Sequence, residues 1–141
     1  MIALTSSVEN RIREAGERAW PNECCGFLLG LQEGGEKRAD CVLAVENAWE
    51  AGEQYHRFVI TPEDFMRAEK EARQRNREIL GIYHSHPDHP ARPSEYDTEQ
   101  ALPFYSYVIV SVQKGKAAEL TSWELTDNRD QFLEEKVTLW R

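Results

Sequence analysis

The chain has 141 residues, of which 40% are hydrophobic and 30% charged, a composition that suits one globular domain with its own core. The net charge of −8 argues against nucleic-acid binding, which needs clustered positive charge. No apolar stretch approaches the roughly 20 residues that span a bilayer, and the first residues lack a signal-peptide pattern. We therefore expect a cytoplasmic protein, a single domain over residues 1–141, that binds neither nucleic acid nor membranes.

Helical and extended patterns alternate along the chain, which predicts a mixed α/β domain. The first half is expected to contain an amphipathic helix, a buried strand in a hairpin with a second strand, a polar loop, a short strand and a second helix. That second helix has a strong start signal, because Thr61 is followed by proline and two acids. The first helix is expected at residues 7–20, the hairpin strands at 24–29 and 39–45, and the polar loop at 47–54. The short strand is expected at residues 57–60 and the second helix at 61 to about 75.

The second half of the chain starts with an apolar run at residues 79–84, which predicts a buried strand that ends in histidines. Three prolines between residues 87 and 93 keep the next segment out of regular structure. Ser94 is expected to cap a short helix that ends near residue 102. Strands are expected at about 105–112 and 117–125, and residues 130–140 fit a helix or a strand.

A candidate metal site lies where the strand at 79–84 ends. His84 and His86 are spaced i, i+2, and alternate side chains of an extended segment point the same way, so both imidazoles can face one point. A helical turn that opens at Ser94 can bring the Asp97 carboxylate to that point. Two imidazoles and one carboxylate leave a tetrahedral zinc ion one open position, as in a hydrolase. We predict His84, His86 and Asp97 as zinc ligands of an enzyme.

Parts of this pattern are equally consistent with a purely structural role. Ser94 and Asp97 have the spacing of a capping box, which needs no function, although a cap can also aim the carboxylate. Asp88 and His89 are weaker candidate ligands in the loop, with His89 ranked fourth. His56 is isolated in the sequence and has no expected role.

The three cysteines do not predict a disulfide framework, because Cys24 and Cys25 are neighbours and Cys41 has no obvious mate. Free thiols suit a reducing cytoplasm. A cysteine nucleophile would need a nearby histidine, whereas the apolar run at residues 24–29 favours inert core thiols. The H-E-x-x-H, G-x-S-x-G and P-loop patterns are absent from the sequence.

The spacing of these residues resembles the JAMM motif, also called MPN+, of the Mov34-type metalloproteases. In that motif a glutamate lies well upstream of H-[ST]-H-x7-S-x-x-D. This chain has Glu23, then His84-Ser85-His86, seven residues, and Ser94-Glu95-Tyr96-Asp97, so every fixed position is filled. Glu23 also precedes an apolar strand that ends in glycine. The chain looks like a compact prokaryotic-type member of this family.

The resemblance implies a single-domain α/β fold with a mostly antiparallel sheet flanked by helices, an architecture similar to that of cytidine deaminases. It implies one zinc ion, with a catalytic water, held by His84, His86 and Asp97. Glu23 would be the general acid/base and Ser94 would stabilise the oxyanion. The expected reaction is hydrolysis of the peptide or isopeptide bond after the C-terminal Gly-Gly tail of a ubiquitin-like protein, such as a sulfur carrier.

Two other functions remain open from the sequence. Mov34-type domains without the motif serve as scaffolds, so one alternative is a non-catalytic binding module, although every catalytic position is filled here. The other alternative is a zinc hydrolase of a small amide. The H-x-E and P-C-x-x-C pattern of the nucleobase deaminases is missing, which argues against deaminase chemistry.

Overall fold

The protein is described by a computed structural model that covers residues 1–140. Its helices are α1 (Ser6–Ala19), α2 (Pro62–Gln74) and α3 (Glu95–Gln100), with one short 3-10 turn, η1 (Ala51–Glu53). Its strands are β1 (Ile2–Thr5), β2 (Cys25–Glu33), β3 (Glu36–Val45), β4 (Glu78–Pro87), β5 (Ser106–Gln113), β6 (Lys116–Leu125), β7 (Phe132–Glu135) and β8 (Val137–Trp140). Among these helices, none combines the length and apolarity needed to cross a membrane.

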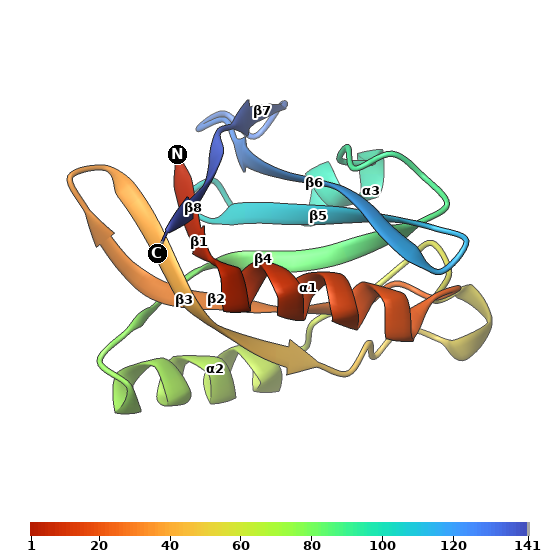
Figure 1. Ribbon diagram of the computed structural model, residues 1–141, viewed down its shortest axis with the longest axis horizontal. Coiled ribbons are helices and arrows are strands. Elements are labelled where there is room, and N and C mark those ends of the chain that lie inside the picture. Colours follow the sequence, from red (N-terminus) through yellow and green to blue (C-terminus); the bar gives the residue numbers. More distant parts are fainter. Residues whose placement is uncertain (141) are drawn as a thin grey trace.

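The strands form one sheet in the order β7-β6-β5-β4-β2-β3-β1-β8 (Figure 1). Neighbouring strands are antiparallel at β2–β3, β2–β4, β5–β6 and β6–β7, and parallel at β1–β3, β1–β8 and β4–β5. The expected mixed, mostly antiparallel sheet flanked by helices is confirmed.

The two faces of the sheet carry separate hydrophobic clusters, because side chains alternate along each strand. On β2, Leu28 belongs to the cluster that packs against Val8 and Ile12 of α1. Its neighbours Phe27 and Leu29 belong to the opposite cluster, which includes Ala68 and Ala72 of α2 and the residue that follows α3. Figure 1 shows α1 lying across its face of the sheet. The helices therefore cover both faces of the central strands.

Hydrogen-bonded caps start all three helices, as their sequences favour. Thr5 accepts a hydrogen bond from the Val8 N–H at 3.1 Å before α1. Thr61 and Asp64 form a complete capping box at the start of α2. The predicted starts of the helices at residues 7, 61 and 94 agree with the structure to within about one residue.

Two parts of the secondary structure differ from the sequence-based prediction. The first helix is preceded by β1, which the sequence did not reveal because a four-residue strand is too short to show a period. The strand expected at residues 57–60 is wrong, since this segment joins no ladder. Its Val59 N–H donates instead to the Asn47 side chain at 3.3 Å. The ambiguous segment at 130–140 forms β7 and β8.

The pairing of β2 with β4 determines what lies near the histidines. Cys25 is opposite His84 in this antiparallel pair. One residue before the ladder of β2, the Cys24 N–H donates to the Ser85 Oγ at 2.8 Å, and the Cys24 carbonyl accepts from the Ser85 N–H at 3.3 Å. These bonds join residues 61 positions apart in sequence. As a result, Glu23 lies beside the end of β4.

Replacement of Ser85, which is 0% exposed, tests this connection. Ser85→Ala is expected to lower the free energy of unfolding by about 1–3 kcal/mol, because the Cys24 N–H loses its acceptor. Urea denaturation measures the change. The control is Ser7→Ala at an exposed position of α1, expected to change stability by less than about 0.5 kcal/mol. Equal stability of the two variants would contradict the assigned role of Ser85.

Candidate metal centre and adjoining cleft

The two histidines at the end of β4 point to the face of the sheet that carries α3. His84 is 1% exposed and His86 is 7% exposed, so both rings are buried. The Phe58 ring stacks on the His84 ring at a centroid distance of 4.6 Å. The His86 Nδ1 lies 3.0 Å from the Pro90 carbonyl oxygen, which can only accept, so this nitrogen carries a proton. The His86 Nε2 faces Asp97 across the site, and in the neutral ring it presents its lone pair there.

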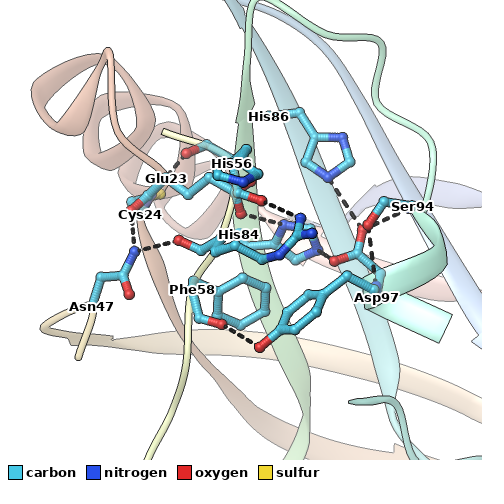
Figure 2. A network of polar contacts seen from close by, with 12 residues as sticks. Glu23, Cys24, Asn47, His56, Phe58, His84, His86, Ser94 and Asp97 are labelled. Carbon is cyan, nitrogen blue, oxygen red and sulfur yellow. Dashed lines mark hydrogen bonds and ion pairs between the residues drawn. The ribbon is translucent and has the colours of Figure 1, made fainter. Parts of the chain in front are cut away.

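The capping box of α3 aims the third side chain at the histidines. Ser94 Oγ accepts a hydrogen bond from the Asp97 N–H at 3.1 Å, and Asp97 Oδ2 accepts from the Ser94 N–H at 2.8 Å. Held in this way, Asp97 Oδ2 lies 3.2 Å from His86 Nε2, and Oδ1 lies 3.7 Å from His84 Nε2 (Figure 2). The Ser94–Asp97 pair is therefore a structural cap that also points a carboxylate into the site.

Electrostatics at this point favour a positive charge. Burial acts to raise the pKa of the Asp97 carboxyl, but His84, His86 and the Ser94 N–H outweigh it and hold that pKa well below its usual range. Burial acts to lower the pKa of His84, but the carboxylates of Asp97 and Glu23 outweigh it and raise that pKa. Asp97 is therefore ionised at neutral pH.

The geometry of the three side chains fits a bound metal ion. Their ligand atoms all lie within 4.8 Å of one another. Asp97 faces each histidine with a different oxygen, Oδ2 at 3.2 Å from His86 Nε2 and Oδ1 at 3.7 Å from His84 Nε2, so two imidazoles and one carboxylate surround a common point. His86 Nε2 lies 3.2 Å from the ionised Asp97 Oδ2, a contact that a proton on the ring stabilises and that a bound metal ion would replace. His84, His86 and Asp97 are thus able to bind a metal.

Glu23 lies next to this group without belonging to it. Its side chain is buried, and Oε1 is 3.7 Å from His84 Nδ1, an ion-pair distance rather than a hydrogen bond. The His84 Nδ1 is buried and has no hydrogen-bond partner among residues 1–140. Figure 2 shows Glu23 and Asp97 at different edges of the His84 ring. The structure thus brings together all five residues that the sequence singled out.

A cleft of about 290 Å³ opens at this group. Glu23, His86 and Ser94 line it, together with side chains from two flanking loops, namely His56, Arg57, His89, Pro90 and Arg92. His89 lies in the cleft but outside the group of potential metal ligands. His56 and Arg57 had no expected functional role, because His56 is isolated in the sequence and Arg57 was expected only to begin a short strand.

A second cavity, of about 190 Å³, adjoins the metal-binding group. His84 and Asp97 contribute to its wall, and most of the remaining lining is apolar or aromatic, including Phe58, Ile82 and Tyr107. The buried ligands therefore adjoin a cleft lined mostly by charged and polar residues and a cavity lined mostly by apolar and aromatic residues. Low polarity behind a metal site strengthens electrostatic interactions within it.

The cysteines near the cleft do not have the properties of a nucleophile. All three cysteines are free. Burial raises the pKa of Cys24 to about 11 and that of Cys25 to about 12. At neutral pH both remain thiols, which are poor nucleophiles.

Comparison with known proteins places the chain among relatives of similar size. The family model described as prokaryotic homologues of the JAB domain matches residues 5–126. A desampylase from Pyrococcus furiosus is 31% identical over 117 residues, which cover 83% of this chain and 76% of that protein.

Solved structures agree with this assignment. A solution structure of a protein from Desulfitobacterium hafniense has a TM-score of 0.87 and 31% identity, and the match covers 100% of this chain and 94% of that chain. A JAB1/MPN domain protein from Archaeoglobus fulgidus, 18% identical, has the same fold with a TM-score of 0.63, covering 100% of this chain and 98% of the other. The sequence match, the fold and the motif together establish that this chain belongs to the prokaryotic JAB-domain family, as a compact member of the JAMM/MPN type.

Proposed function

We propose that this protein is a zinc-dependent metallopeptidase that hydrolyses the peptide or isopeptide bond after the C-terminal Gly-Gly tail of a ubiquitin-like protein. The observation that carries the proposal is the meeting of His84, His86 and Asp97 at a cleft lined by Glu23 and Ser94. The name of the desampylase relative supports action on a conjugated ubiquitin-like protein. A binding module without activity would not need this combination of side chains.

The donor set supports zinc as the metal, because two imidazoles and one carboxylate with an open position are typical of catalytic zinc. When bound, zinc supplies a Lewis acid for the scissile carbonyl and lowers the pKa of an attacking water. The protein's own contribution is to hold the three ligands in buried positions, with His86 and Asp97 oriented by hydrogen bonds and the His84 ring stacked against Phe58. Such preorganisation reduces the free-energy cost of assembling the site.

Glu23 is proposed as the general acid/base. Its carboxylate lies beside the metal-binding group and lines the cleft, so it can accept the proton of an attacking water. The same carboxyl would then give this proton to the nitrogen of the leaving amine, which balances the hydrolysis. The leaving nitrogen is an α-amine for a peptide bond or a lysine amine for an isopeptide bond.

Ser94 is proposed to stabilise the negative charge that develops on the scissile carbonyl oxygen. Its Oγ already accepts the Asp97 N–H, which leaves the hydroxyl hydrogen available for a second partner. Ser94 is exposed and lines the cleft. A hydroxyl held by a helix cap is a preorganised donor, and such donors lower barriers in acyl transfer.

The substrate class is supported by the cleft wall. Residues 57–60 belong to no strand of the sheet, and Arg57 lines the cleft. The carbonyls of Arg57 and Phe58 already accept hydrogen bonds from Asn47 and Tyr96, so the tail is proposed to lie in the cleft itself, with side-chain-free glycines nearest the metal-binding group.

Metal analysis tests the proposed centre. The purified protein is expected to bind one zinc ion, to lose peptidase activity in a chelator and to recover it with added zinc. His86→Ala is expected to weaken zinc binding by more than about 100-fold. Loss of a residue that only hydrogen-bonds to a metal ligand already lowers metal affinity by about 10–100-fold. His89→Ala, which removes an imidazole in the same cleft, should retain zinc. Equal zinc affinity of the two variants would contradict the ligand set.

Replacement of Glu23 tests the acid/base assignment. Glu23→Gln is expected to keep zinc and to lower kcat by about 10²–10⁴-fold, the usual contribution of general acid/base catalysis. The assay uses a ubiquitin-like protein with a Gly-Gly tail fused to a short peptide, compared with small acyl amides. Glu50→Gln, at an exposed position, is the control. An unchanged kcat in Glu23→Gln would refute the mechanism, and faster turnover of the small amides would refute the substrate class.

A further inference from the structure

The sheet does not hold the backbone of Glu23. The ladders of β2 with β3 and β4 begin at Cys25, two residues later. The backbone groups of Glu23 bond instead to the loop between β3 and α2. Its N–H donates to the Gln54 carbonyl at 2.7 Å, and its carbonyl accepts from the Asn47 Nδ2 at 3.2 Å. The position of the proposed acid/base therefore depends on this loop.

Asn47 is the centre of the loop. Besides Glu23, its Nδ2 donates to the Arg57 carbonyl at 2.9 Å. Its Oδ1 accepts from the Trp49 N–H at 3.0 Å and from the Val59 N–H at 3.3 Å. One side-chain amide thus uses both donor hydrogens and both acceptor positions on four backbone groups. Three of these groups belong to the loop and one belongs to Glu23.

Gln54 closes the same loop from its other end. Its Nε2 donates to the Asn47 carbonyl at 3.1 Å and to the Trp49 carbonyl at 2.7 Å. Its own carbonyl accepts from the Glu23 N–H, as described above. Glu23 is therefore tied at both of its backbone groups to a loop whose internal hydrogen bonds centre on Asn47.

The far end of this loop is one wall of the cleft. Arg57 lines the cleft, and Phe58 stacks on the His84 ring. The Tyr96 hydroxyl of α3 donates to the Phe58 carbonyl at 3.1 Å, and the Arg57 guanidinium lies 4.8 Å from the centre of the Tyr96 ring. The wall is thus held to the metal-binding side by α3 and to Glu23 by Asn47.

We propose that Asn47 is a positioning residue for catalysis, which sets the separation between the Glu23 carboxylate and the cleft wall of Arg57 and Phe58. Figure 2 shows its amide between the Glu23 backbone and the loop. Asn47 is not among the residues that line the cleft, so it acts through Glu23 and the wall. The inference rests on the proposed role of Glu23 as acid/base.

The near-isosteric change Asn47→Asp tests the donating nitrogen of the amide separately from its accepting oxygen. A carboxylate still offers an oxygen to Trp49 and Val59, but it places an acceptor against the carbonyls of Glu23 and Arg57. In the zinc-loaded enzyme, kcat is expected to fall by about 10–100-fold, as for other orienting partners, while zinc affinity stays within about twofold. The matched control is Asn10→Asp at an exposed position of α1, with wild-type kcat expected.

A double variant distinguishes positioning from damage to the fold. In a Glu23→Gln background, Asn47→Asp is expected to lower the residual kcat by less than about threefold, because residues that act through one group are not additive. The proposal would be overturned if the decrease in kcat of the double variant equals the product of the decreases in the two single variants. Wild-type kcat in Asn47→Asp alone would also overturn it. If Asn47→Asp is too unstable to isolate, Asn47→Ala removes all four bonds of the side chain without adding charge. Loss of zinc together with folding in both variants would also overturn it, since it would indicate a purely structural role.

These outcomes are separable from failure of the proposed function. If the wild-type enzyme does not cleave the tailed substrate, or if Glu23→Gln cleaves normally, the proposed function fails and the role of Asn47 fails with it. If Glu23→Gln is inactive but Asn47→Asp is fully active, only the positioning role is wrong.

Discussion

The hydrogen-bonded pairing of β2 with β4 is the interaction on which the whole site depends. β4 alone supplies two histidines, and any strand with that spacing would do the same. The bonds between Cys24 and Ser85 extend the pairing past the end of the ladder and bring the Glu23 backbone beside the His84 ring. Ser85, the middle residue of the histidine motif, thus has a structural task on the opposite face of the strand from its two neighbours.

Local secondary-structure signals and site chemistry coincide at Ser94 and Asp97. A capping box satisfies backbone groups at the start of α3, and the same hydrogen bonds restrict the Asp97 side chain to one orientation. The helix has only six residues, so its own length contributes little stability. The helix contributes to the site by orienting the Asp97 carboxylate, because Asp97 lies in the first turn, where the cap fixes the geometry. The same atoms therefore cap a helix and orient a metal ligand.

Elements with long apolar runs were predictable from the sequence, and short or irregular ones were not. β2, β4 and β5 are buried on both faces and read as continuous apolar segments. β1, β7 and β8 have four residues each, and the pairing of β1 with β3 and β8 joins segments far apart in sequence. Residues 57–60 have the composition of a strand, but side-chain hydrogen bonds from Asn47 and Tyr96 take the place of a ladder.

For the site, the sequence by itself determined the relations that follow from regular secondary structure. The i, i+2 spacing of His84 and His86 and the capping distance from Ser94 to Asp97 follow from strand and helix geometry. Only the tertiary structure decided that Asn47 joins the Glu23 backbone to the wall formed by Arg57. The reason is physical: local geometry repeats with a period that a sequence displays, whereas contacts between distant segments depend on strand register and loop path, which no period encodes.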